Sequence, residues 1–264
     1  MTIDHAYWAS YLLAGVDERR EVKAITKQLD ELGVDDAYAI QAALLELHRD
    51  RGDSLAGAKL GLTSVAKQEQ MKVSEPIYGW VLASSVLGPD QPVQLGELIH
   101  PRVEPEFVFV LGSDLAGPNI TANDVLDATE KVVGGIEVID SRYEAFSFTL
   151  PDVIADATSA ARVMVGQVGV GPRDADLTTM GCVFEVDGNI TGTAAGAALL
   201  GDPAHCVAML ANHLGKHGQK LDAGWIVMAG AATDARPLLP GTVAIARYSH
   251  LGTVSVTASA GKAI

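Results

Sequence analysis

Three glutamates in two apolar segments have the types and spacing that most clearly suggest chemistry. Glu104 and Glu106 begin a predicted strand over 103–111, and Glu137 lies in a second predicted strand over 132–140. Side chains of a strand alternate between its faces, so Glu104 and Glu106 point the same way. Carboxylates in an apolar setting repel one another and lose hydration. A divalent cation such as Mg²⁺ or Mn²⁺, which prefers oxygen ligands, would stabilise them.

Two other interpretations remain open for these acids. They could be solvated residues at the edge of a sheet, or they could form ion pairs with Arg102 and Arg142. E-x-E pairs are common on exposed strands, so the spacing alone does not decide between a metal site and an exposed face.

Lys59 is a second candidate, because it stands alone among the small and apolar residues of the segment 57–64. Burial would lower its pKa and suit it to proton transfer or to stabilisation of an enolate. The alternative is a lysine whose stem lies along apolar surface while its ammonium group reaches solvent from a strand end.

These residues must be positioned by a chain that changes texture along its length. The first fifty-odd residues have helical spacing, with a helix predicted over 35–49 and an aspartate of Val34-Asp35-Asp36 as its N-cap. From Gly57 onward, short β-rich runs alternate with Gly, Pro and Asp. Further strands are predicted over 163–170, 181–186, 225–228, 242–247 and 251–258, and helices over 122–130 and 203–216. The sequence therefore predicts an α+β fold with a helical N-terminal region, 1–55, and a mixed β domain, 56–264, rolled around a core.

Composition excludes several classes of partner. The 264 residues include 19 Lys and Arg but 33 Asp and Glu, for a net charge of −14, which argues against nucleic acid and against an anionic membrane surface. The two cysteines cannot form a secreted disulfide framework, and neither a signal peptide nor a transmembrane run is visible, so a cytoplasmic protein is expected. His213 and His217 are interpreted as surface residues.

Several motifs in one order resemble the hydratase/decarboxylase family of the fumarylacetoacetate hydrolase superfamily, which acts in meta-cleavage degradation of aromatic compounds. The resemblance covers nearly the whole chain. Its motifs are KLGLTSVAKQEQM (59–71), EPIYGW (75–80), LIHPRVEPEF (98–107), GIEVIDSRYEAFSF (135–148), DVIAD (152–156), GAALLGDP (196–203) and the final LGTVSV. It implies a fumarylacetoacetate-hydrolase-like mixed β roll.

The resemblance also implies roles for individual residues. It gives Glu104, Glu106 and Glu137 as ligands of Mg²⁺ or Mn²⁺ and Lys59 as the catalytic cation. It implies that the substrate pocket is lined by Leu62, Tyr78, Tyr143, Asp156 and Ser159. Two segments depart from the family pattern: Asp-Asn-Ala-Ser-Ser is replaced by residues 156–160, Asp-Ala-Thr-Ser-Ala, and Thr-Gly-Gly by residues 229–231, Ala-Gly-Ala.

The activity that the resemblance implies is metal-dependent decarboxylation of 2-oxo-3-hexenedioate to 2-hydroxypenta-2,4-dienoate. Alternatives are hydration of 2-hydroxypenta-2,4-dienoate, or a non-catalytic subunit that partners the hydratase of the pathway. Hydrolysis of a β-diketone ranks last, because no clear His–Glu pair lies near the motifs. A small 2-oxo acid substrate and an oligomer are expected. A cation at the distal carboxylate would stabilise the ground state, so aromatic groups such as Tyr78 or Tyr143 are expected there instead.

Overall fold

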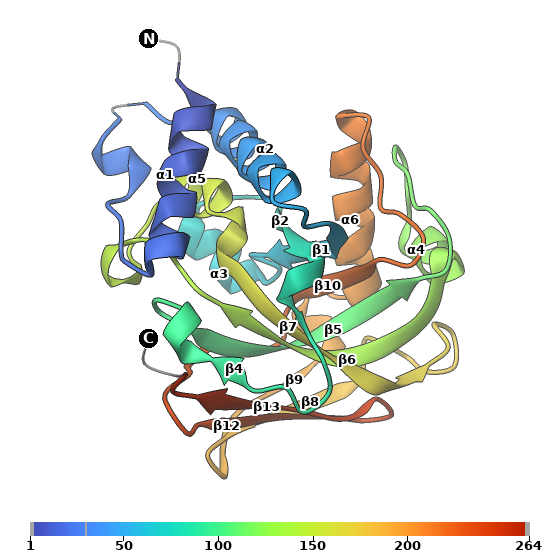
Figure 1. Ribbon diagram of the computed structural model, residues 1–264. Helices are drawn as coiled ribbons and strands as arrows, with labels where there is room; N and C mark the ends of the chain where they lie inside the picture. The colour runs from blue at the N-terminus through green and yellow to red at the C-terminus, as the bar shows by residue number, and fades with distance from the viewer. Residues whose placement is uncertain (1–2, 30, 262–264) are drawn as a thin grey trace.

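The computed structural model describes residues 3–29 and 31–261, whose strands form two stacked sheets (Figure 1). The larger sheet has the order β2-β1-β10-β5-β6-β7-β3, with β11 paired to β5. Its strands are β1 (Leu55–Gly61), β2 (Ile77–Leu82), β3 (Val86–Leu87), β5 (Arg102–Leu111), β6 (Thr129–Ile139), β7 (Ala160–Val170), β10 (Ile226–Ala231) and β11 (Arg236–Pro237). The smaller sheet, in the order β4-β13-β12-β8-β9, comprises β4 (Val93–Gln94), β8 (Gly181–Val186), β9 (Asn189–Ala195), β12 (Val243–Tyr248) and β13 (Gly252–Ser259).

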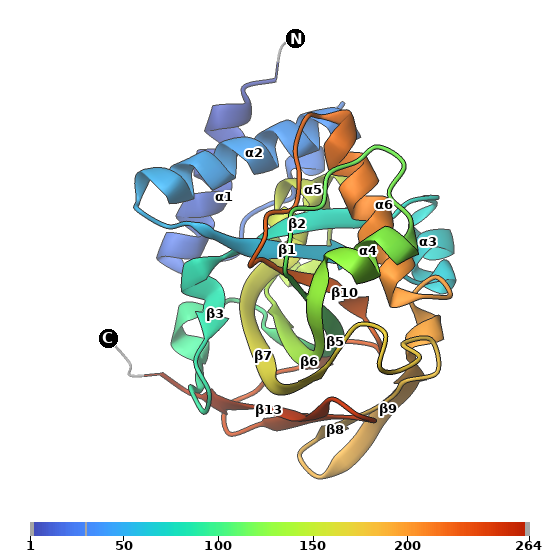
Figure 2. The ribbon, with the colours of Figure 1, turned by 90° about the vertical axis from the view of Figure 1, so that its right-hand side faces the viewer.

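Helices pack against the larger sheet. They are α1 (His5–Glu18), α2 (Val34–Asp50), α3 (Val65–Met71), α4 (Ala122–Ala128), α5 (Leu150–Ala155) and α6 (Pro203–Lys216), of which α6 packs on β10 and β1. Figure 2 shows α1 and α2 above β1 and β2, with the smaller sheet at the opposite end of the molecule and β7 curving between them. None of these helices, within the described ranges, is long and apolar enough to cross a membrane.

Two hydrophobic cores hold these layers together. The larger one joins side chains of both sheets and α6, including Phe107, Phe184 and Leu210. The second lies beneath α1 and α2, but it also contains Tyr143 and Ile154 from the later part of the chain. Because that core is shared, a boundary between a helical region, 1–55, and a domain over 56–264 stays a prediction.

The observed elements agree with the α+β fold that the sequence predicts. Each predicted strand falls on an observed one, and the helix predicted over 203–216 has those bounds. Two details were wrong. The helix predicted over 122–130 ends at Ala128, because the β-branched Thr129 and the valines after it begin β6. Gly33 caps α2, and Asp35 and Asp36 instead lie in its first turn, where their charge favours the helix dipole.

Candidate metal and active site

The structure brings Glu104, Glu106 and Glu137 together in the middle of the larger sheet. Glu104 of β5 lies opposite Glu137 of β6 in the register of the two strands, and Glu106 follows on the same face of β5. One carboxylate oxygen from each residue lies within 4.8 Å of the other two. Glu106 and Glu137 are 0% exposed, so the acids do not lie at a solvated edge.

These carboxylates are poorly compensated by the protein. The backbone N–H of Gly230 donates to Oε2 of Glu106 at 2.8 Å. Over the described residues, Oε1 of Glu106 and Oε1 of Glu137 accept no hydrogen bond. Burial raises the pKa of Glu106 well above its usual range, repulsion by Glu137 adds to it, and burial likewise raises the pKa of Glu137. The donor set fits a hard divalent cation, because such a cation binds carboxylate oxygens and removes their repulsion.

Position 230 can be occupied only by glycine. Its φ is +113°, and a Cβ at this position would lie 1.8 Å from Oγ1 of Thr63. It is also the central residue of the Ala-Gly-Ala segment that departs from the family pattern. The backbone contact to Glu106 is therefore present although Ala229 replaces the threonine of the family pattern.

Lys59 of β1 is enclosed at the same site. Its side chain is 2% exposed, and its Nζ lies 3.0 Å from Oε2 of Glu137 and 3.2 Å from the carbonyl oxygen of Thr158. The alternative interpretation, in which the ammonium group of Lys59 reaches solvent from a strand end, is therefore wrong. Burial lowers the pKa of Lys59, but the three surrounding glutamates more than offset this, so the pKa is raised. The lowered pKa expected from burial alone was wrong, because the sequence did not reveal how many acids surround this lysine.

The carbonyl that holds Lys59 belongs to an unusual turn. Ala157, Thr158 and Ser159 are consecutive non-glycine residues with φ of 48°, 57° and 58°. The left-handed region costs roughly 1–2 kcal/mol for each L-residue, so surrounding contacts must hold the turn. Ser159 donates its N–H to the carbonyl of Asp156 at 2.8 Å, and Gly79 leaves room for the carbonyl of Ala157, which a Cβ would approach to 2.3 Å.

A cavity of about 410 Å³ opens beside Lys59 and Glu104. Leu62 and Ser159, two of the predicted pocket residues, line it. So do Arg102 and Lys67, together with Phe146 and Phe148. The aromatic side chains of this wall are the two phenylalanines rather than Tyr78 or Tyr143, which were expected at the distal carboxylate.

The other predicted pocket residues lie outside this wall. Tyr78 pairs with Leu60 across β1 and β2, and so points to the face opposite Lys59, where its ring stacks on Tyr38 at 4.7 Å. Tyr143 is fully buried, and its hydroxyl donates to the carbonyl of Asp152. Asp156 is 0% exposed and pairs with Arg142. None of these three is among the residues that line the cavity.

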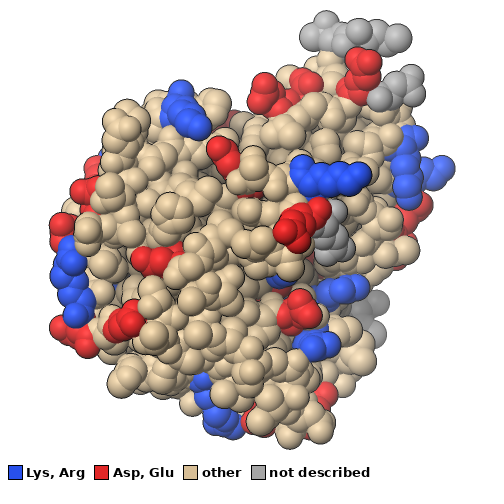
Figure 3. All heavy atoms as spheres, turned by 180° about the vertical axis from the view of Figure 1, so that it is seen from behind, with Lys and Arg blue, Asp and Glu red and all other residues tan. Residues whose placement is uncertain are grey.

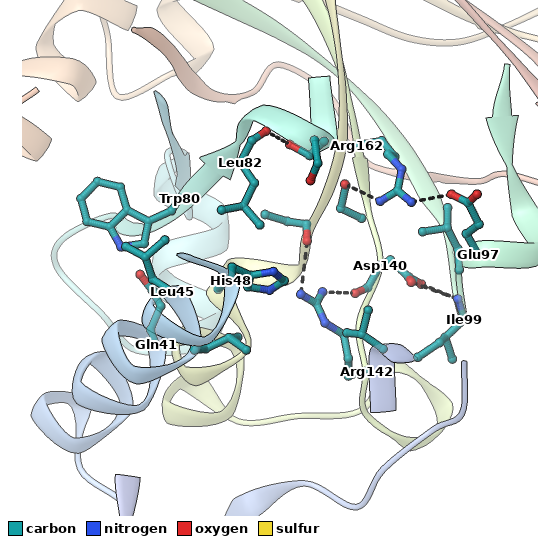
Figure 4. A pocket seen from close by; sticks show the side chains of 18 residues that line it. Gln41, Leu45, His48, Trp80, Leu82, Glu97, Ile99, Asp140, Arg142 and Arg162 are labelled. Carbon is teal, nitrogen blue, oxygen red and sulfur yellow. Dashed lines mark hydrogen bonds and ion pairs between the residues drawn. The ribbon is translucent and has the colours of Figure 1, made fainter. Parts of the chain in front are cut away.

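A second cavity, of about 230 Å³, lies on the far side of the segment 157–160 (Figure 4). Arg142 is at its base, with Nε 2.9 Å from the Asp156 carboxylate and its two terminal nitrogens donating to the carbonyls of Asp140 and Ala160. The Asp140 carboxylate accepts the N–H of Ile99. Arg142 is thus committed to this buried network, and the idea that it pairs with the three glutamates is wrong.

Comparison with known proteins agrees with this geometry. No family model matches the chain. It is 41% identical over 239 residues to a 4-oxalocrotonate decarboxylase of Pseudomonas putida, covering 90% of each chain. It is 39% identical over 202 residues to a 2-hydroxypent-2,4-dienoate hydratase of P. putida, covering 76% of this chain and 91% of that one. The structure of 4-oxalocrotonate decarboxylase from P. putida G7, complexed with magnesium and adipate, superposes with a TM-score of 0.93 at 36% identity over 96% of each chain.

The chain belongs to the hydratase/decarboxylase family of the fumarylacetoacetate hydrolase superfamily. A fumarylacetoacetate hydrolase from Exiguobacterium antarcticum, 15% identical with a TM-score of 0.61 over 78% of this chain and 75% of that one, shares the fold. The relatives named above are enzymes by name, which supports enzymatic activity for this chain.

Sequence reasoning missed several residues of the site. Thr158 and Arg102 line the cavity, and Gly230 binds Glu106 through its backbone. Period-two alternation could have found Arg102, which shares a face of β5 with Glu104. The roles of Thr158 and Gly230 depend on backbone groups, for which a side-chain pattern gives no signal.

Proposed function

We propose that this protein decarboxylates 2-oxo-3-hexenedioate, also called 4-oxalocrotonate, to 2-hydroxypenta-2,4-dienoate in meta-cleavage degradation of aromatic compounds. It would act as a carbon–carbon lyase that depends on Mg²⁺ or Mn²⁺. The observation that carries this proposal is the group of three buried glutamates around Lys59 beside one cavity. The names of the most similar relatives support the choice of reaction.

Glu104, Glu106 and Glu137 would hold the cation. When bound, a divalent cation acts as a Lewis acid that polarises the ketone of a 2-oxo acid. Lys59 adds a positive charge that is already fixed in place, because Glu137 and the Thr158 carbonyl hold its ammonium group. A charge that needs no reorganisation stabilises the negative charge that develops on the substrate during reaction.

The substrate is a vinylogous β-keto acid, in which the distal carboxylate is separated from the ketone by a double bond. The bond to the distal carboxylate breaks and CO₂ leaves. The released electron pair moves through the double bond to the former ketone oxygen, which then takes a proton to give the dienol. The apolar side chains of Leu62, Phe146 and Phe148 in the cavity wall lower the local polarity near this charge, which strengthens its interaction with Lys59.

Turnover of two substrates tests the proposal directly. The purified protein, with Mg²⁺ or Mn²⁺, is given 2-oxo-3-hexenedioate or 2-hydroxypenta-2,4-dienoate, and the reaction is followed by ultraviolet absorbance. We expect loss of the diacid, release of CO₂ and inhibition by EDTA. Consumption of the dienol with no action on the diacid would identify a hydratase instead, which the 39% identical relative makes the second candidate.

A non-catalytic partner subunit is tested by Lys59→Ala, assayed in complex with the pathway hydratase. The decarboxylation rate of the assembly falls if this chain is the catalyst. An unchanged rate in an intact, metal-loaded assembly would assign the chemistry to another subunit. The proposal has three further parts: the chain associates with the hydratase, it forms an oligomer, and Leu62 and Ser159 contact the substrate.

A further inference from the structure

Arg102 differs from every other arginine in the described part of the chain. Each of the others donates to a carboxylate or to a backbone carbonyl. Across residues 3–29 and 31–261, the guanidinium of Arg102 has no hydrogen-bond or ion-pair partner, although the residue is half-buried. A guanidinium at the wall of a cavity, whose donors no described residue uses, is available to an acceptor that the chain itself does not supply.

The surroundings of Arg102 leave its edge available. Its guanidinium carbon lies 4.1 Å from the centre of the Phe146 ring, so the ring covers one face of the planar group. The N–H groups lie in the plane of the guanidinium, and a carboxylate binds them in that plane through two parallel hydrogen bonds. Arg102 and Phe146 both line the cavity beside Lys59.

The position of Arg102 along β5 sets its spacing from the glutamates. Arg102, Glu104 and Glu106 alternate onto one face of the strand. A rise of about 3.3 Å per residue puts the Cα of Arg102 roughly 7 Å from that of Glu104. Because Arg102 and Glu104 also line one cavity, a short diacid can lie with one end at the glutamates and the other at the guanidinium.

We propose that Arg102 is a specificity-determining residue, which binds the carboxylate at the far end of the substrate and selects six-carbon dicarboxylates over monocarboxylates. This inference rests on the proposed function and deepens it. The bond stabilises the carboxylate before CO₂ leaves, so Arg102 contributes to substrate binding rather than to the chemical step. Covering one face of the guanidinium with Phe146 fixes its orientation.

Lys67 of α3 provides a matched control. It lines the same cavity, and within the described ranges it too has no ion-pair partner. Its ammonium group is a point charge on a flexible stem, whereas arginine offers a planar pair of donors. Lys67→Met removes the same charge from the same cavity without removing that pair.

Calorimetric titration of the Mg²⁺-loaded full chain with adipate and with hexanoate tests the proposal. We expect adipate to bind the wild type more tightly than hexanoate. Arg102→Met should lower the affinity for adipate about tenfold or more and change the affinity for hexanoate by less than about threefold. Lys67→Met should weaken both acids to a similar, smaller extent. Equal losses for both acids in Arg102→Met, no loss for either, or the same selective loss in Lys67→Met would each overturn the proposal.

Arg102→Lys covers the case in which Arg102→Met does not fold. It keeps the charge and loses the paired donors, so adipate should bind several-fold more weakly than to wild type, and equal affinity would overturn the proposal.

In turnover of the diacid, Arg102→Met should raise KM without lowering kcat. Selective loss of adipate binding in a protein that decarboxylates no diacid would refute the proposed reaction but not this role. Decarboxylation of the diacid by the wild type, together with unchanged adipate binding in Arg102→Met, would refute this role but not the proposed reaction.

Discussion

The two cavities each contain a buried cation paired with a carboxylate, and they differ in the balance of the remaining charge. In one, Lys59 lies 3.0 Å from Glu137, with two more glutamates beside it. In the other, Arg142 lies 2.9 Å from Asp156, and its terminal nitrogens donate to two carbonyls. The first site has an excess of acid, whereas in the second site one cation faces one carboxylate and its terminal nitrogens donate to the backbone.

This difference separates a site built for a ligand from one built for the fold. Burying a charge is expensive, so uncompensated charges persist where a ligand completes them. The pair formed by Arg142 and Asp156 instead lies under the turn whose carbonyl holds Lys59. Breaking the first site should therefore reduce activity, and breaking the second should reduce stability.

The largest effect is expected from Glu106→Gln, which removes a carboxylate from the site with excess acid. Mg²⁺ affinity should fall, and turnover should drop on the order of a hundredfold or more. Calorimetric titration with Mg²⁺ and steady-state kinetics measure the two effects. Glu130→Gln, an exposed position of the neighbouring strand β6, is the control and should change neither. Unchanged Mg²⁺ affinity in Glu106→Gln would refute the metal site.

Arg142→Met should break the closed pair. Above about pH 7, where Asp156 is ionised, it leaves the carboxylate buried without its cation, which costs about 3–5 kcal/mol in the free energy of unfolding. Urea denaturation measures this change. Arg173→Met removes an exposed ion pair with Asp127 and should cost no more than about 1 kcal/mol. Equal losses in the two variants would show that the buried pair has no special role in stability.

The pH dependence of stability sharpens the same comparison. Burial raises the pKa of Asp156 from 3.8 to about 7, although Arg142 lowers it. The folded protein keeps this proton where the unfolded chain has lost it, so stability from this group is complete below about pH 4 and is lost as the pH rises to about 7. Asp156→Asn should flatten the dependence by up to about 1.4 kcal/mol per pH unit. Parallel curves for variant and wild type, from urea denaturation across this range, would contradict the assignment.

The smallest effect is expected at Thr158. Within the described residues its buried hydroxyl has no hydrogen-bond partner, so Thr158→Val should change the free energy of unfolding by less than about 1 kcal/mol, in the stabilising direction. Thr129→Val is the matched control, because that buried hydroxyl donates to the carbonyl of Val125 at 2.6 Å. It should destabilise the protein by about 1 kcal/mol. Thermal denaturation of both variants measures these changes. A larger loss of stability in Thr158→Val than in Thr129→Val would show that the Thr158 hydroxyl has a hydrogen-bond partner after all.

How far the sequence could predict this arrangement depends on which atoms are involved. Alternation along a strand was sufficient to put Glu104 and Glu106 on one face. The apolar neighbours of Glu137 and Lys59 marked these two as candidates, and family resemblance gave them roles. The face on which Tyr78 lies depends on its register with Leu60, which no local pattern specifies. The left-handed turn could not be predicted either, because none of its three residues is a glycine and only tertiary contacts impose it.

Figure 3 shows one face of the molecule, on which Lys and Arg side chains are separated from one another by acidic and uncharged surface. On this face the basic side chains do not gather into a patch. The cations that matter for the proposed chemistry are instead half-buried or buried at the cavity, where Arg102 and Lys59 lie. Net charge therefore says little about the charge that a small anion meets.

The peptide carbonyl of Thr158 fixes the orientation of a lysine 99 positions away in sequence. Every amino acid carries that carbonyl, so residue identity at position 158 can drift while the tether persists. What the protein must preserve is the path of its main chain between Asp156 and Ala160. An insertion or deletion there would misdirect the ammonium group even if each functional side chain were retained, which makes loop length a better guide to competence in related chains than the letters within the loop.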